Sequence, residues 1–186
     1  MLGIHLPTTA WCGVRGSGVK KLKSFFMSVA TTVAAASFSS AAAAEELQTY
    51  DTVGVWDVLI DTTIGNGCLI NAVFEDGSDV RIGFAPETGF GYILAMNEAW
   101  DGIVPGTVYP ISMDVDGAVY QGEGTGIVID GYPGVDIEFD SAEFLMDVAT
   151  KQTLTLLNDA GPVMSIDLTD SLAALDAALT CQEEQG

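Results

Sequence analysis

The chain has 186 residues, with 26 acidic and 6 basic side chains and a hydrophobic content of 48%. All 26 acids follow Ala44, whereas four of the six basic residues precede it. The 186 − 44 = 142 residues after Ala44 therefore carry a formal charge of 2 − 26 = −24. Such a surface repels phosphate, which argues against nucleic acid and acidic membranes as partners. The apolar content predicts a folded domain, because disordered chains are poor in apolar residues.

The first 44 residues have the pattern of a secretory signal peptide. Residues 19–23 are cationic, residues 25–38 form an apolar, alanine-rich run, and small residues lead up to Ala44. Signal peptidase accepts this pattern, so we expect cleavage after Ala44 and a single exported domain at 45–186, periplasmic or secreted. Residues 1–18 precede the cationic stretch and indicate an over-extended start. The apolar run is shorter than the roughly 20 residues of a stable membrane span.

Export determines how the cysteines are interpreted. Cys12 leaves with the signal segment, so Cys68 and Cys181 remain as an even pair in an oxidising compartment, and we expect a disulfide. In the chain-entropy model, a disulfide between residues that are 181 − 68 = 113 positions apart stabilises the fold by about 4–5 kcal/mol. A zinc site or a cysteine nucleophile is disfavoured, because the only histidine, His5, precedes Ala44.

Alternating apolar and polar residues predict strands along most of the remaining chain. The first four are expected at residues 53–60, 68–74, 80–84 and 91–96, and the next four at 107–115, 119–121, 126–129 and 135–139. The glycines from Gly122 to Gly126 are interpreted as a bend or bulge between two of these strands. A last hairpin is expected at residues 153–157 and 163–168.

Two short helices complete the predicted fold. Asp140-Ser141-Ala142-Glu143 has the form of a capping box ahead of an apolar stripe. Residues 169–171 can cap a second, C-terminal helix that ends near Cys181, and the face expected to cover the sheet contains Leu172, Leu175 and Leu179. The pattern predicts a mainly β fold, an antiparallel β-sandwich or barrel-like meander of about eight to ten strands with these two helices.

No catalytic residue is predicted. Without histidine after Ala44, Ser-His-Asp and Cys-His sites are excluded, and no pair among the 26 acids is distinguished as a glycosidase pair. Asp114-Val-Asp116-Gly117 and Asp76-Gly77-Ser78-Asp79 place oxygen ligands on tight turns, so weak Ca²⁺ binding, with Asp114 and Asp116 as ligands, is the metal hypothesis. The alternative is that Asp-Gly pairs only form turns between strands. No other cofactor is expected.

Two tryptophans after Ala44 are candidates for stacking on a sugar. Trp56 lies inside an apolar strand segment and is expected in the core. Trp100 lies with Asp101 in a polar loop, where it is either a plug that closes the loop or an exposed contact. Trp100 and Asp101 are therefore the candidate binding residues.

Short motifs are spread over residues 50–181: Trp56, Gly65-Asn66-Gly67-Cys68, Asp76-Gly77, Arg81-Ile82-Gly83, Asn97-x-x-Trp100, Gly106-x-x-Tyr109, and residues 171–175 followed by Cys181. Together they resemble a group of small exported alphaproteobacterial proteins without an assigned function. A fainter similarity links the chain to the invasion-associated locus B proteins, which are also exported and poor in cysteine. The resemblance implies a periplasmic β domain and assigns no catalytic or binding residue.

The sequence thus predicts a non-catalytic periplasmic or secreted protein, a binding or interaction module with a strongly acidic surface. Its expected partners are a cationic protein, a peptide or divalent ions, since 26 − 2 = 24 carboxylates lack a side-chain cation. The alternatives are a carbohydrate-binding or carbohydrate-cleaving β-sandwich that uses Trp100, and a structural envelope protein. Acids such as Asp136 and Glu138 alternate with apolar residues and are expected on a solvated strand face.

Overall fold

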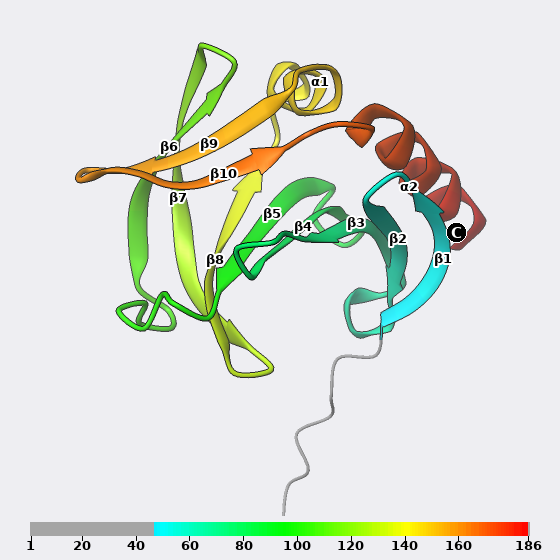
Figure 1. The fold of residues 1–186 in the computed structure, drawn as a ribbon. Helices are drawn as coiled ribbons and strands as arrows, with labels where there is room; N and C mark the ends of the chain where they lie inside the picture. Colours follow the sequence, from blue (N-terminus) through cyan, green and yellow to red (C-terminus); the bar gives the residue numbers. More distant parts are fainter. Residues whose placement is uncertain (1–46, 186) are drawn as a thin grey trace, which may run out of the picture. The chain divides into compact units, whose positions relative to one another are not determined.

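The computed structural model describes residues 47–185, so the predicted signal peptide at 1–44 lies outside the described residues. The described part contains ten strands, two α-helices and a short 3₁₀ helix (Figure 1). The strands are β1 Leu47–Val53, β2 Trp56–Asp61, β3 Gly67–Val73, β4 Ser78–Ala85, β5 Phe90–Asn97, β6 Val108–Val115, β7 Ala118–Ile129, β8 Tyr132–Phe139, β9 Thr153–Asn158 and β10 Gly161–Asp167. The helices are η1 Thr62–Ile64, α1 Ala142–Thr150 and α2 Ser171–Gln185. The mainly β prediction is confirmed.

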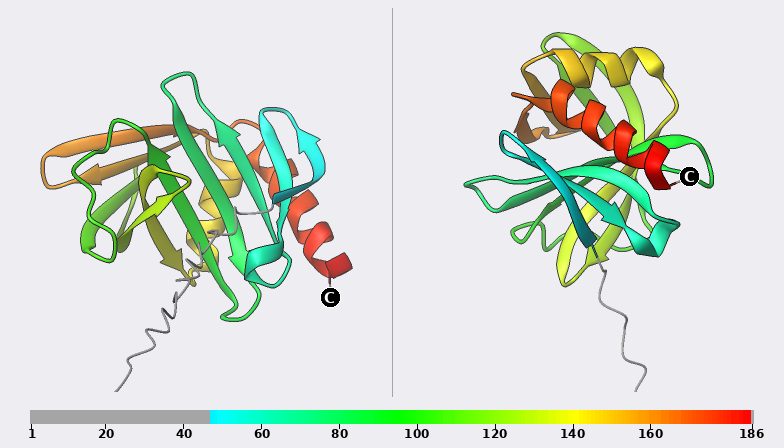
Figure 2. Two further views of the ribbon diagram at one scale, coloured as in Figure 1. Left: turned by 90° about the horizontal axis from the view of Figure 1, so that it is seen from below. Right: turned by 90° about the vertical axis from the view of Figure 1, so that its right-hand side faces the viewer.

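All ten strands belong to one open antiparallel sheet in the order β1-β2-β3-β4-β5-β8-β7-β6-β9-β10. The first five strands form a meander, and the next three return in reverse order, so that β8 pairs with β5 and β9 with β6. The sheet curls on itself, and its inner face shares one core with both helices (Figure 1). Figure 2 shows α2 crossing the open side of the curled sheet.

The core follows from the period-two pattern of the strands. One row of inward side chains crosses five neighbouring strands with no solvent exposure, and it consists of Val58, Ile70, Ile82, Ile93 and Ile137. Trp56 is fully buried, as predicted, and its indole Nε1 donates a hydrogen bond of 2.9 Å to the carbonyl oxygen of Thr169. That bond connects the start of β2 to the segment before α2.

The first predicted strand, at residues 53–60, is in fact the end of β1 and most of β2. Val53 pairs with Trp56, which leaves Gly54 and Val55 as a two-residue turn. Gly54 has φ +61°, the conformation that a type II′ hairpin requires at its first central position. Val55 is 63% exposed, so an apolar residue in the turn made the two strands look like one.

The predicted bend or bulge between Gly122 and Gly126 is wrong, because β7 runs through it as one strand of 12 residues with no shift in register. These glycines instead let neighbouring segments of the chain approach β7 closely. A Cβ at Gly124 would lie 2.5 Å from Ile111 Cδ1 and 3.2 Å from Val135 Cβ. A side chain at this position would therefore displace the core that β6 and β8 contribute.

Helix α1 begins one residue later than the capping-box pattern indicated. Ser141, and not Asp140, is the N-cap, and its Oγ accepts a 3.2 Å hydrogen bond from the amide of Phe144. Glu143 is consequently one residue too close to the cap to complete the box. The apolar stripe itself is confirmed, since Phe144 and Val148 are buried against the sheet.

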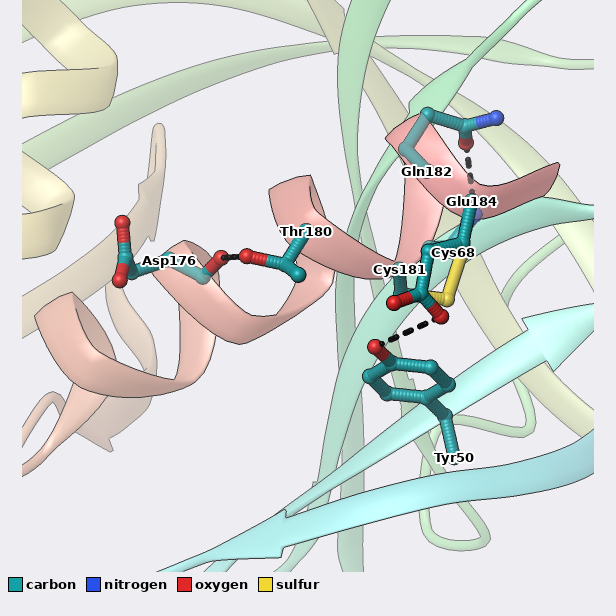
Figure 3. Close-up of a disulfide and its surroundings, with 7 residues drawn as sticks. All are labelled: Tyr50, Cys68, Asp176, Thr180, Cys181, Gln182 and Glu184. Carbon is teal, nitrogen blue, oxygen red and sulfur yellow. Dashed lines mark hydrogen bonds between the residues drawn. A yellow bond between two sulfur atoms is a disulfide. The ribbon is translucent and has the colours of Figure 1, made fainter. Parts of the chain in front are cut away.

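Helix α2 is joined to β3 by the predicted disulfide between Cys68 and Cys181, whose Cα atoms are 6.1 Å apart (Figure 3). Two hydrogen bonds flank it: the Cys68 amide donates to Gln182 Oε1 at 2.9 Å, and the Tyr50 hydroxyl donates to Glu184 Oε2 at 3.0 Å. The helix continues to Gln185, so Cys181 lies within it rather than at its end.

The predicted apolar face of α2 is wrong for two of its three leucines. Leu175 is buried, but Leu172 and Leu179 are 54% and 46% exposed. The disulfide accounts for this, because it requires the face that contains Cys181 to turn toward the sheet. That face consists of Ser171, Ala174, Leu175, Ala178 and Cys181, all buried.

Candidate functional site

The two predicted binding residues line the same pocket. Trp100 and Asp101 lie in the loop between β5 and β6, at the mouth of a cavity of about 290 Å³. Strand β6 and the β9–β10 hairpin supply other walls, which include Tyr109, Leu157 and Val163. The walls are mostly aliphatic and aromatic, so the pocket combines an apolar interior with the carboxylate of Asp101.

Backbone hydrogen bonds hold Trp100 in place. Its amide donates to the carbonyl oxygen of Asn97 at 3.0 Å, and its own carbonyl accepts from the amide of Ile103 at 3.1 Å. The Tyr109 hydroxyl accepts a 2.9 Å bond from the amide of Val104, which ties the loop to β6. The indole ring is half-buried and packs against the core. Trp100 is therefore a loop plug that also lines an open pocket.

Few polar groups face this pocket. The Asn158 side chain accepts from the amide of Ala160 at 2.8 Å, and the Tyr109 hydroxyl is already engaged. The Asp101 side chain is exposed. Within residues 47–185 the indole N–H of Trp100 donates no hydrogen bond, so it remains available to a ligand together with the Asp101 carboxylate.

The aspartates proposed for calcium shape the turn between β6 and β7. Asp114 Oδ1 accepts from the amide of Gly117 at 2.6 Å, and Asp116 Oδ2 accepts from the amide of Gln152 at 2.7 Å. Asp116 also has φ +48°, a turn conformation. No group of three or more His, Cys, Asp or Glu side chains in the described part of the chain is placed to hold a metal ion. Calcium binding stays a prediction without a formed site.

The outer face of the sheet contains a second feature that the sequence reasoning missed. Asp136 was expected on a solvated face with Glu138, but it is half-buried, and burial followed by the nearby charge of Glu138 raises its pKa. The cause is apolar packing on that face, where Leu94 is the cross-strand partner of Asp136. Asp136 lines a depression of about 400 Å³, in which it holds its proton to a higher pH than an ordinary aspartate.

Tyr92 explains why this outer face is partly apolar. A Cβ at Gly83 would lie 2.6 Å from the Tyr92 hydroxyl, so the ring lies across the glycine on the neighbouring strand. Together with Leu59 and Leu69 it forms a small buried cluster separate from the main core. A pattern of alternating residues places Tyr92 and Asp136 on the outer face, but it does not show that the face is covered.

A polar network secures α1 to the sheet. Asp147 accepts a 2.8 Å hydrogen bond from the Tyr120 hydroxyl and lies 2.8 Å from Lys151 Nζ. Lys151 also donates to the carbonyl oxygen of Val115 at 3.1 Å. The bond from Lys151, then that from Tyr120, lowers the pKa of Asp147, and the bond to Asp147 raises the pKa of Tyr120 to about 12.

Comparison with known proteins supports the fold alone. No family model matches the chain, and no match is found among curated proteins. A crystal structure of invasion associated protein B from Bartonella henselae is similar, with a TM-score of 0.53 and 16% sequence identity over 72% of this chain and 97% of that chain. This finding confirms the faint similarity that the sequence motifs indicated. Among residues 47–185, no helix has both the length and the apolar character to span a membrane.

Proposed function

We propose that the domain is a non-catalytic binding module of a periplasmic or secreted protein, and that its acidic surface engages a cationic partner. The observation that carries this proposal is the exposure of the acids: 19 of the 24 Asp and Glu side chains in residues 47–185 are exposed. Both basic side chains of this region already contact a carboxylate, Lys151 with Asp147 at 2.8 Å and Arg81 with Asp79 at 3.9 Å. The other carboxylates in this region have no basic side chain to pair with, so the exposed ones are open to solvent and to a cationic partner.

An uncompensated acidic surface attracts cationic molecules over distances of about one Debye length, roughly 8 Å at physiological salt. Such complementarity increases the association rate and favours basic partners over acidic ones. The disulfide is compatible with an exported protein, because such bonds persist in oxidising compartments. A cationic protein, a basic peptide or divalent ions are the partner classes that fit this chemistry.

A salt-dependent pull-down tests the proposal. Residues 45–186 would be immobilised, exposed to periplasmic extract at low salt and eluted at high salt. The matched control replaces exposed glutamates that make no side-chain hydrogen bond in the described structure: Glu75→Gln, Glu87→Gln, Glu123→Gln, Glu143→Gln and Glu183→Gln. Basic partners should bind the native protein and be weakened in the control. Recovery of no partner at low salt would contradict the proposal.

A carbohydrate-binding role is the second candidate, and it is favoured by the indole of Trp100 at the mouth of a pocket. The aliphatic walls offer few hydrogen-bond partners for sugar hydroxyls, which ranks it below a cationic partner. Soluble peptidoglycan fragments provide the test. Binding that Trp100→Ala leaves unchanged would contradict this role. Absence of any soluble ligand in both assays would favour a structural envelope protein.

A further inference from the structure

The Trp100 pocket is lined by one acid and adjoined by a second. Asp101 lines it, and the exposed Asp159 directly follows the lining residue Asn158, whereas Glu98 lines a separate depression next to Asp76 and Asp79. No basic side chain lines the pocket. The nearest lysine in the sequence is Lys151, which precedes β9 and lies 156 − 151 = 5 residues before the lining residue Leu156, about 16 Å along an extended segment. The field at the mouth is therefore negative.

We infer that this pocket receives one apolar side chain of a peptide segment that carries Lys or Arg beside it. The inference rests on the proposed function, because it specifies how a cationic partner is recognised. A cavity of about 290 Å³ is just below the roughly 300–1,000 Å³ range of ligand pockets, which suits a single side chain. The apolar walls, including Leu157 and Val163, would bury that side chain.

The charge and the walls together select a basic peptide over other ligands. A lipid phosphate would be repelled by Asp101 and Asp159. A sugar would meet mostly aliphatic walls and would leave its hydroxyls without partners. A basic residue next to the buried side chain would lie near the Asp101 carboxylate, where charge pairing attracts it.

Three synthetic peptides of equal length test the inference, with Lys-Leu-Lys, Lys-Ser-Lys or Glu-Leu-Glu between terminal glycines. They would be titrated at low salt into ¹⁵N-labelled residues 45–186, and the Trp100 indole N–H signal, assigned with Trp100→Phe, would report on the pocket. The Trp56 indole is an internal reference, since it is buried and bonded to Thr169. We expect the Leu peptide to shift the Trp100 signal and to bind about tenfold more tightly than the Ser peptide. The acidic peptide should not bind.

Matched variants separate the apolar contact from the charge. Ala99→Phe introduces a bulky side chain at an exposed lining position, so it should abolish the preference for Leu over Ser while leaving charge-driven binding intact. Asp101→Asn should weaken both lysine peptides severalfold, whereas Asp176→Asn on α2 should change neither. Because Ala99 and Asp101 are exposed, their variants should remain folded and still test the inference if Trp100→Ala disturbs the fold.

The outcomes distinguish the inference from the function on which it rests. Equal binding of the Leu and Ser peptides, without movement of the Trp100 signal, would overturn the inference and leave the acidic binding module standing. A Trp100 signal that moves only with a peptidoglycan fragment would overturn it in favour of a carbohydrate. If no lysine peptide binds at low salt, the inference and the proposed function both fail.

Discussion

Helices α1 and α2 cover the same core but are attached to the sheet by different chemistry. A network of Tyr120, Asp147 and Lys151 secures α1, and all three side chains are partly exposed. A disulfide and a face of small buried residues secure α2. The attachment of α1 therefore responds to pH and salt, whereas that of α2 responds to reduction. One core can thus be weakened by two independent chemical conditions.

The two helices also meet each other. The buried Ser171 Oγ at the start of α2 donates to the carbonyl oxygen of Val148 at 2.9 Å and lies 3.3 Å from that of Ala149, both in α1. The start of α2 and the end of α1 are therefore in direct contact. Variants on each side, and at the junction, show how far the two attachments are independent.

The largest expected effect is loss of the disulfide. Replacing both cysteines, Cys68→Ala with Cys181→Ala, should lower the free energy of unfolding by about 4–5 kcal/mol, because a loop of 113 residues is released in the unfolded chain. Denaturant unfolding measures this. Reduction of the native protein should give a similar loss, and a loss below about 1 kcal/mol would show that α2 is held mainly by packing.

Leucine substitutions test which face of α2 is buried. Leu175→Ala should cost about 2–5 kcal/mol, because it leaves a cavity next to the core. Leu179→Ala, on the exposed side, should change stability by no more than about 0.5 kcal/mol. Denaturant curves of the two variants give the comparison, and equal losses would mean that the helix is rotated from the face that the disulfide imposes.

The junction between the helices should have a smaller effect. Ser171→Ala removes a buried hydrogen bond to the end of α1 and should cost about 1 kcal/mol. Thr180→Ala removes a comparable but exposed bond within α2 and serves as the control. Thermal unfolding of both variants measures the difference. If they lose the same stability, the bond does not couple the helices.

Alkaline pH should weaken the attachment of α1 selectively. The pKa of Tyr120 is raised to about 12 in the folded protein, above the value of about 10 in an unfolded chain, so its contribution is complete below pH 10 and is lost as the pH rises through 12. The pKa of Asp147 is lowered, so its contribution is lost in acid. Stability should fall less steeply above pH 10 in Tyr120→Phe. The tyrosinate absorbance of that variant should also lack a step near pH 12.

Added salt should have the smallest effect on stability. It should stabilise the domain as a whole but weaken the ion pair of Lys151 and Asp147. Added NaCl or Ca²⁺ screens the repulsion among the exposed acids, so the melting temperature should rise, although the pair of Lys151 and Asp147 is weakened. The variant with five glutamates replaced by glutamine should show a shallower rise. A melting temperature that stays flat from low to high salt would contradict the expected self-repulsion.

The sequence was sufficient for features that depend on local pattern or on a single possible pairing. Period-two alternation located segments of strands β2 to β10 but missed β1, and the even cysteine count predicted the bond between Cys68 and Cys181. The burial of Trp56 followed from its place in an apolar run. Features set by contacts between distant segments were not predictable. The rotation of α2 and the continuity of β7 depend on the disulfide and on the fit of Gly124 against Ile111.

In the candidate site, too, the residues that are close in sequence were predictable and those from distant strands were not. Trp100 and Asp101 are neighbours in sequence, so one loop presented both. Tyr109, Leu157 and Val163 join them only because β6 lies next to β9 in the sheet order. Nothing local in those segments indicates that order. The partial burial of Asp136 likewise results from side chains on neighbouring strands.

The position of Cys181 also imposes an order of events on the growing chain. Ribosomes complete all ten strands before they reach this cysteine, so its bond to Cys68 closes only around a sheet whose residues are all present. In a chain translated from Met1, Cys12 would be made before Cys68. A chain that keeps its first residues offers Cys68 an earlier and incorrect thiol. Removal of that segment before oxidation would leave Cys181 as the only partner, and correct pairing would then require no isomerase.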